Sequence, residues 1–218
     1  MTGAPVNRRG RLLVASPSLV DDNFRRAVVL MLEHSDEGAL GLVLNRPTGL
    51  VAAEALPDRI ADLLSPSELV YEGGPVQPEA VIVLADFIDP SDAPTLSFDS
   101  VGIVDPERLA STPGEIRTAR AFGGYAGWAA GQLEREIEQD AWIDSHATAG
   151  DVFTDAPDGL WSGVLERKGG TYRLVARMPE DPTHNRRTRP RHRAQARSLR
   201  GVPPRVDITG IGMVTGLG

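Results

Sequence analysis

A serine, a histidine and an aspartate near the N-terminus are the residue types that could form a nucleophilic triad. Ser16 follows one predicted strand and His34 ends the next, with Asp21 and Asp22 between them. The Gly-x-Ser-x-Gly turn that presents the nucleophile of many hydrolases is absent from the sequence. Because a triad is recognised by geometry and not by residue type, we expect His34 to cap a turn or to hydrogen-bond within its own turn. A hydrolase of unknown substrate is the second alternative function.

Two glycine-rich segments are further candidates for a site. The first is Gly73-Gly74-Pro75, and the second runs from Phe122 to Trp142 and opens with a predicted glycine turn. Backbone N–H groups at the start of a helix attract anions. However, the second segment lacks both the dinucleotide fingerprint and the Gly-Lys-Ser/Thr of a phosphate loop. Close packing around the glycines explains the pattern more simply, and Gly127→Val should then destabilise the fold.

The two glycine segments could still meet and form a groove lined by backbone. Each contains a glycine pair beside apolar strands, and glycine has no side chain to fill the space between two chain segments. We therefore predict a candidate ligand groove, with no catalytic residue assigned to it. Its residues are Gly73, Gly74, Gly123, Gly124, Tyr125, Gly127, Trp128, Asn45 and His34.

Neither a metal nor a cofactor is predicted. His34 and His146 stand alone outside the C-terminal tail, without the His-Glu-x-x-His spacing of a zinc site. The chain has no cysteine, which excludes disulfides and thiolate ligands. Paired carboxylates such as Asp21-Asp22, and the acidic residues between 134 and 140, have the composition of solvated surface.

Charge divides the chain into two unlike parts. The net charge is −7, yet residues 181–218 contain eight arginines and two aspartates. Arginines neutralise nucleic-acid phosphates in a sequence-independent, salt-sensitive way. Weak non-specific nucleic-acid contact through this tail makes a DNA-associated transcriptional regulator the first alternative function. The tail has no interleaved aromatic residues, and a disordered soluble extension explains it more simply.

No apolar run approaches the roughly 20 residues that a membrane-spanning helix needs. Arg8-Arg9 precede only four apolar residues, Leu12 to Ala15, whereas a signal peptide needs about 7–15. We predict a cytoplasmic protein that does not contact the membrane.

Most of the predicted elements are strands. His34–Gly38 is a five-residue connection that contains glycine, which favours an antiparallel hairpin between its two flanking strands. Residues 86–100, rich in Asp, Pro and Ser, predict a loop, and Asp105-Pro106-Glu107 is typical of a helix start. Continuous β-branched and apolar runs predict strands at 11–16, 27–33, 39–45, 81–85 and 101–104.

Helices are predicted in two places. Residues 48–64 have helical apolar spacing, and Pro57 divides them into two short helices or one kinked helix. A second helix is predicted from about Trp128 to about Gln139, with Leu133 and Ile137 one turn apart on one face.

Three sequence blocks follow one another along the chain: Gly10–Pro17 with Asn23-Phe24, Glu33-His34 and Gly41–Pro47; Gly73–Val76; and Gly124–Trp128 with Gly131–Glu134 and Trp142. Together these blocks resemble the YqgE/AlgH family of bacterial proteins. The resemblance covers roughly residues 8–176 and implies a single α+β domain, whose bulged, mostly antiparallel sheet curls on itself between flanking helices. It implies no reaction, although one branch of the family is labelled a transcriptional regulator. The last dozen residues weakly resemble the opening of β-ketoacyl synthases, without that family's cysteine.

These expectations define three segments: a globular domain over residues 1–180, an Arg/Pro-rich disordered linker or tail over 181–205, and a short apolar and glycine segment over 206–218. The predicted function is a non-catalytic binding or regulatory module with an unidentified protein or small-molecule partner.

Overall fold

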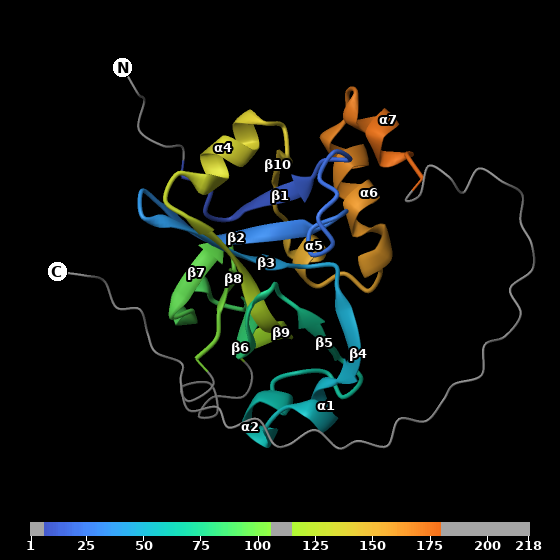
Figure 1. Cartoon of the computed structure of the whole chain (residues 1–218). Helices are drawn as coiled ribbons and strands as arrows, with labels where there is room; N and C mark the ends of the chain where they lie inside the picture. The colour runs from blue at the N-terminus through green and yellow to red at the C-terminus, as the bar shows by residue number, and fades with distance from the viewer. Residues whose placement is uncertain (1–6, 106–114, 180–218) are drawn as a thin grey trace, which may run out of the picture.

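The computed structural model describes residues 7–105 and 115–179 (Figure 1). Within them, ten strands form one sheet with the order β10-β1-β2-β3-β9-β6-β8-β7, while β5 also pairs with β9 and β4 pairs with β5. The strands are β1 (Arg11–Ala15), β2 (Val28–Ser35), β3 (Gly38–Val43), β4 (Pro47–Val51), β5 (Leu69–Glu72), β6 (Val76–Phe87), β7 (Thr95–Phe98), β8 (Val101–Ile103), β9 (Ile116–Ala129) and β10 (Trp142–His146).

The sheet is mostly antiparallel and interrupted by bulges. Its parallel pair joins β5 to β9, with Tyr71 opposite Phe122. The long strand β9 pairs with β3 through its last residues and with β6 along most of its length, so it connects the two halves of the sheet. The predicted hairpin is confirmed as β2 and β3, with a register shift between Met31 and Glu33. The predicted α+β class is confirmed.

Short helices cover the sheet on several sides (Figure 1). Pro57 separates α1 from α2, so the prediction of two short helices is confirmed, although residues 48–51 before them are extended. The helices are α1 (Ala52–Ala55), α2 (Asp58–Ala61), α4 (Gln132–Glu138), α5 (Ala149–Val152), α6 (Pro157–Lys168) and α7 (Tyr172–Ala176), with a 3₁₀ turn at Pro90–Asp92.

Strand β1 is buried on both faces, which explains its unbroken apolar run. Leu12 and Val14 pack in the cluster that contains α6 residues. Leu13 and Ala15 pack in the opposite cluster, which contains Leu133 of α4. Each Å² of apolar surface that is buried contributes about 25 cal/mol to stability. Packing on both faces therefore stabilises the centre of the sheet.

The helix predicted from Trp128 begins later, and the predicted glycine turn is wrong. Residues 116–129 form one strand, because pairing with β3 and β6 holds the backbone extended through the glycines. The chain turns instead at Gly131, whose φ of 68° is left-handed, and α4 starts at Gln132. The predicted loop over 86–100 is also partly wrong, since it contains β7. The helix start predicted at 105–107 falls largely outside the described residues.

The two predicted glycine segments lie in direct backbone contact. The Gly73 N–H donates to the Gly123 carbonyl at 2.8 Å. A Cβ added at Gly74, where φ is +151°, would lie 2.2 Å from the Tyr125 carbonyl carbon. At Gly127 an added Cβ would meet nothing closer than 3.6 Å. The tight approach is therefore at Gly74 and its neighbours, and not at Gly127, where we had expected it.

This contact predicts that Gly74→Ala destabilises the protein by about 2–3 kcal/mol, because the backbone of β9 must move to admit the methyl group. Gly127→Ala is the matched control and should leave stability unchanged or slightly raised, since alanine restricts the unfolded chain. Urea unfolding followed by circular dichroism measures both. Equal midpoints for the two variants would show that the glycine contact does not constrain the fold.

Candidate functional site

His34 is fully committed to structural hydrogen bonds. Its side chain is 2% exposed, and its Nε2 atom lies 2.7 Å from Glu134 Oε1 on α4. Its Nδ1 atom accepts the Arg8 backbone N–H at 3.2 Å, which leaves Nε2 as the protonated nitrogen that donates to Glu134. These partners lie far away in sequence, so the expectation that His34 bonds within its own turn is wrong. Ser16 pairs instead with the Ser18 hydroxyl at 2.7 Å.

The contact with His34 affects the pKa of Glu134. Partial burial would by itself raise the pKa of Glu134. Hydrogen bonds from its own backbone N–H and from His34, with the electrostatic attraction of His34 and Arg8, outweigh that effect and lower the pKa below its ordinary value. The carboxylate therefore stays ionised and holds α4 against β2.

Trp128 also serves packing. Its indole N–H and that of Trp142 donate to the same oxygen of Glu136, at 2.9 and 2.8 Å. Phe24 stacks on Trp128 with ring centroids 6.2 Å apart. The acidic residues of α4, expected to be solvated surface, thus include Glu134 and Glu136 as side chains that fasten the helix to the sheet. A tryptophan needs a partner for its N–H when it is buried.

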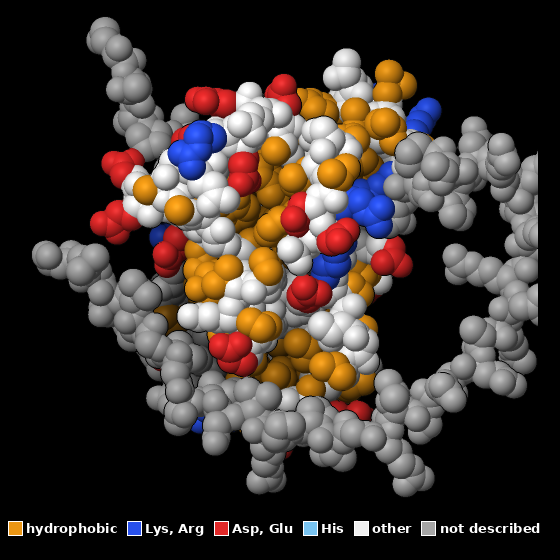
Figure 2. All heavy atoms as spheres, viewed as in Figure 1, with side chains coloured by type: hydrophobic (Ala, Val, Ile, Leu, Met, Phe, Trp, Pro, Cys, Tyr) orange, Lys and Arg blue, Asp and Glu red, His pale blue; other side chains and the backbone are white. Residues whose placement is uncertain are grey.

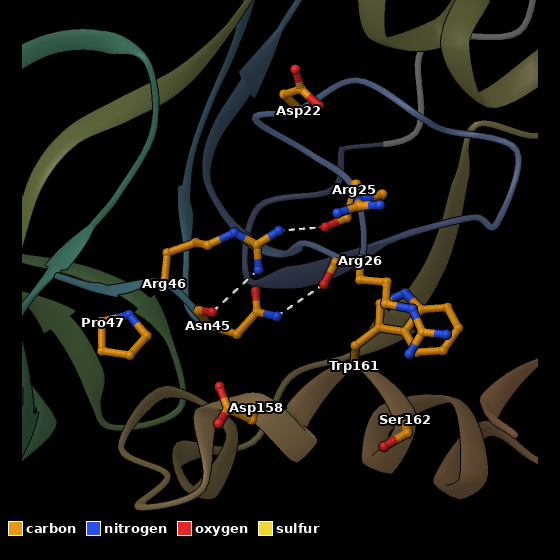
Figure 3. Close-up of a pocket in the computed structure, with 9 residues that line it drawn as sticks. All are labelled: Asp22, Arg25, Arg26, Asn45, Arg46, Pro47, Asp158, Trp161 and Ser162. Carbon is orange, nitrogen blue, oxygen red and sulfur yellow. Dashed lines mark hydrogen bonds between the residues drawn. The ribbon is translucent and has the colours of Figure 1, made fainter. Parts of the chain in front are cut away.

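A pocket of about 660 Å³ lies elsewhere, between the turn before β2, the connection from β3 to β4, and the start of α6 (Figure 3). Figure 2 shows basic and acidic side chains gathered together over this part of the surface. Of the predicted groove residues, Asn45 lines this pocket; a ligand groove at the glycine segments stays a prediction. The lining residues are Asp22, Arg25, Arg26, Asn45, Arg46, Pro47, Asp158, Trp161 and Ser162.

Asn45 holds the turn that leads into β2. Its side chain is buried, Oδ1 accepts the Val28 N–H at 3.0 Å, and Nδ2 donates to the Arg26 carbonyl at 2.9 Å. Arg26 has a φ of 54°, a left-handed conformation that costs a non-glycine residue about 1–2 kcal/mol. The side-chain amide of Asn45 thus makes the two hydrogen bonds that a backbone peptide of a neighbouring strand would make. These bonds stabilise the backbone that carries Arg25 and Arg26.

Arg26 forms one wall of the pocket. Its guanidinium lies over the Trp161 ring, 4.4 Å from the centroid, and donates to the Met178 carbonyl. The ring itself is fixed, because Trp161 Nε1 donates to the Ala15 carbonyl at 2.8 Å. An arginine held flat on a buried indole has little rotamer freedom left to lose when a ligand binds.

Arg46 and Arg25 form the opposite part of the rim (Figure 3). Arg46 donates to the carbonyls of Asn45 and Arg25, so it clamps the same turn from a second side. The Arg25 guanidinium is exposed and makes no hydrogen bond or ion pair within the described parts of the chain. Three arginines therefore line one open pocket, and the guanidinium of Arg25 is available to bind a ligand.

The arginines of this site were missed by reasoning from the sequence. Arg25-Arg26 precede β2 and Arg46 follows β3. In an antiparallel hairpin the start of the first strand lies beside the end of the second. The predicted hairpin thus already contained the signal that brings the arginines together with Asn45.

The described residues contain no group of three histidine, aspartate or glutamate side chains placed to hold a metal ion. In the same ranges, no helix is long and apolar enough to cross a membrane. The pocket lining combines three arginines with two carboxylates, an amide and a hydroxyl. Its arginines suit the binding of an anionic group.

Comparisons with known proteins agree with the sequence blocks. A family model described as AlgH-like matches residues 12–173. The chain is 43% identical over 186 residues to the UPF0301 protein SCO2948 of Streptomyces coelicolor, covering 81% of this chain and 94% of that protein. It is 40% identical over 193 residues to a UPF0301 protein of Chlorobium limicola, covering 82% and 96%.

Two solved structures share the fold. The crystal structure of DIP2367 from Corynebacterium diphtheriae is 25% identical with a TM-score of 0.70, covering 81% of this chain and 95% of that one. The solution structure of AlgH from Pseudomonas aeruginosa is 28% identical with a TM-score of 0.60, covering 82% and 98%. The weak β-ketoacyl synthase resemblance at 206–218 lies outside both the family match and the described residues. All the pocket residues lie within the residues that the family model matches. The chain belongs to the AlgH-like family, as the three sequence blocks predicted.

Proposed function

We propose that this protein is a non-catalytic binding module that captures a small anionic ligand in the arginine pocket. The observation that carries the proposal is the convergence of Arg25, Arg26 and Arg46 on one pocket, with Arg25 making no ion pair among the described residues. A guanidinium presents several N–H donors in a planar fork that matches carboxylate and phosphate oxygens.

Preorganisation supports this proposal. Arg26 is stacked on Trp161 and Arg46 is bonded to two carbonyls, so both side chains are largely ordered before a ligand arrives. Binding then avoids part of the ordering cost, which is about 0.5–1.5 kcal/mol for each long side chain. The catalytic alternative receives less support, because Ser16 and His34 are bonded to Ser18 and to Glu134 respectively.

A cytoplasmic location belongs to the same proposal. It is supported by the absence of cysteine from the sequence, since a chain without disulfides needs no oxidising compartment. The partner is then a soluble anion, and contact with a membrane is not required.

One observation favours the DNA-associated regulator as the second candidate. Arg26 donates to the carbonyl of Met178, so the chain leaves the edge of the pocket shortly before the arginine-rich residues 181–218 begin. In the sequence the arginine-rich residues begin within three positions of this carbonyl, which supports a polyanion as the ligand. Electrostatic affinity of this kind falls steeply as salt is raised.

The pocket is tested by Arg25→Gln, which removes one charged donor without touching the core. We expect the affinity for inorganic phosphate to fall about tenfold, the loss typical of one charge-assisted hydrogen bond. NMR titration of ¹⁵N-labelled arginine side chains measures it. Arg59→Gln on α2, also exposed but distant from the pocket lining, is the matched control and should bind as the wild type does. Equal affinities for all three proteins would contradict the proposal.

The second candidate is tested with a short DNA duplex instead of phosphate. A regulator that uses its tail should bind the duplex in a salt-dependent way as the full chain and lose most of that affinity when the chain ends at residue 180. Negligible affinity for both forms, measured by fluorescence anisotropy over a salt series, would exclude DNA as the partner and leave the small-anion site unaffected.

A further inference from the structure

A carboxylate faces the arginines across the same pocket. Asp158 lies in the first turn of α6, and Figure 3 shows its side chain directed from that helix toward Asn45 and Arg46. Asp158 is exposed and makes no hydrogen bond or ion pair within the described parts of the chain. No ion pair joins it to the facing arginines, so the space between the opposite charges is left open.

This arrangement suits a ligand that also carries a positive charge better than one that carries negative charge alone. A carboxylate on one wall repels an anion that fills the pocket and offsets part of the attraction of the arginines. The pocket instead presents a positive wall, formed by Arg25 and Arg46, and a negative point at Asp158. Opposite charges on opposite walls are complementary to a ligand whose own charges are separated in the same way.

We propose that the ligand is a small zwitterion, whose anionic group binds Arg25 and Arg46 and whose ammonium group binds Asp158. This inference rests on the proposed anion site and names the ligand class for it. The chemistry fits an amino acid or short peptide, with a carboxylate as the anion, and equally an aminoalkyl phosphate. The volume of about 660 Å³ lies within the usual range of small-molecule pockets, about 300–1,000 Å³.

Neighbouring groups complete the two ends of the site. At the anionic end, Asn45 is buried with its amide fixed by Val28 and Arg26, which keeps the arginine wall in place. Ser162 also lines the pocket, and its hydroxyl donates to the Gly159 carbonyl at 3.0 Å, so its oxygen can still accept a hydrogen bond from a ligand. The second carboxylate of the lining, Asp22, lies beyond Arg25 from Asp158 in Figure 3.

Asp158 also suits the structure of α6, because a carboxylate in the first turn of a helix interacts favourably with the helix dipole. That role involves no ligand and predicts a change in stability only. The structural role of Asp158 does not affect which of two ligands binds more tightly when they differ only in an ammonium group. The ratio of their affinities therefore tests the ligand-binding role alone.

The test compares matched ligands by NMR titration of the full-length protein. Glycylglycine is the zwitterion, N-acetylglycylglycine lacks its ammonium group, and inorganic phosphate is the reference anion. Phosphoethanolamine supplies the phosphate form of the zwitterion. At about pH 6.5 the peptide amine is protonated. We expect glycylglycine to bind roughly fivefold more tightly than its acetylated form, the contribution of one half-exposed ion pair.

Variants assign that preference to a residue. Asp158→Asn should bind the two peptides equally and bind phosphate more tightly than the wild type, because a repulsive charge is removed. Asp155→Asn is the matched control, an exposed carboxylate three residues earlier that does not line the pocket, and it should keep the wild-type preference. If phosphoethanolamine binds more tightly than glycylglycine, the anionic group is a phosphate; the reverse order assigns a carboxylate.

The outcomes separate this inference from the function on which it rests. A wild-type protein that binds phosphate at Arg25 but shows no preference for glycylglycine over its acetylated form overturns the zwitterion and keeps the anion site. A preference that is lost in Asp22→Asn and kept in Asp158→Asn overturns the assignment of Asp158. A protein whose Arg25 resonance responds to none of the four ligands overturns both proposals.

Discussion

The pocket depends on one buried side-chain amide. Asn45 bonds the Arg26 carbonyl and the Val28 N–H, and no other side chain of the described residues is bonded to both sides of this turn. Leaving such groups unpaired in the interior costs about 1–3 kcal/mol, and the left-handed backbone of Arg26 costs about 1–2 kcal/mol. The two effects are of similar size, so the amide offsets the strain at Arg26, and the bond from Arg46 to the Arg25 carbonyl supports the same turn. The positions of Arg25 and Arg26 depend on the conformation of this turn.

The sheet in turn holds Asn45. The hairpin of β2 and β3 delivers Asn45 beside the turn, and the apolar clusters on both faces of β1 and β2 keep the hairpin rigid. Trp161 links the pocket to the same strands through the Ala15 carbonyl. Charged side chains on connecting segments are thus supported by a packed core, the usual division between scaffold and binding residues.

The elements that depend on local sequence patterns were predicted from the sequence. Continuous apolar runs predicted the central strands, and the glycine-containing connection predicted the hairpin of β2 and β3. Trp128 was placed in a helix because the helical residues begin only four positions later, at Gln132, and pairing with β3 overrides that local signal. Arg25 and Arg46 were overlooked because their meeting depends on strand register, which short motifs do not contain. Asn45 was among the predicted groove residues, while its role as a clamp is visible only in the structure.

The central claim is that Asn45 preorganises an arginine site for an anion, and Asn45→Leu tests it most directly. Leucine is similar in size and uncharged, and the substitution leaves every arginine in place, so it changes the turn and not the charge of the pocket. The phosphate affinity of this variant, measured under conditions where circular dichroism shows it folded, should fall several-fold as the turn at Arg26 relaxes. An affinity equal to that of the wild type would contradict the account.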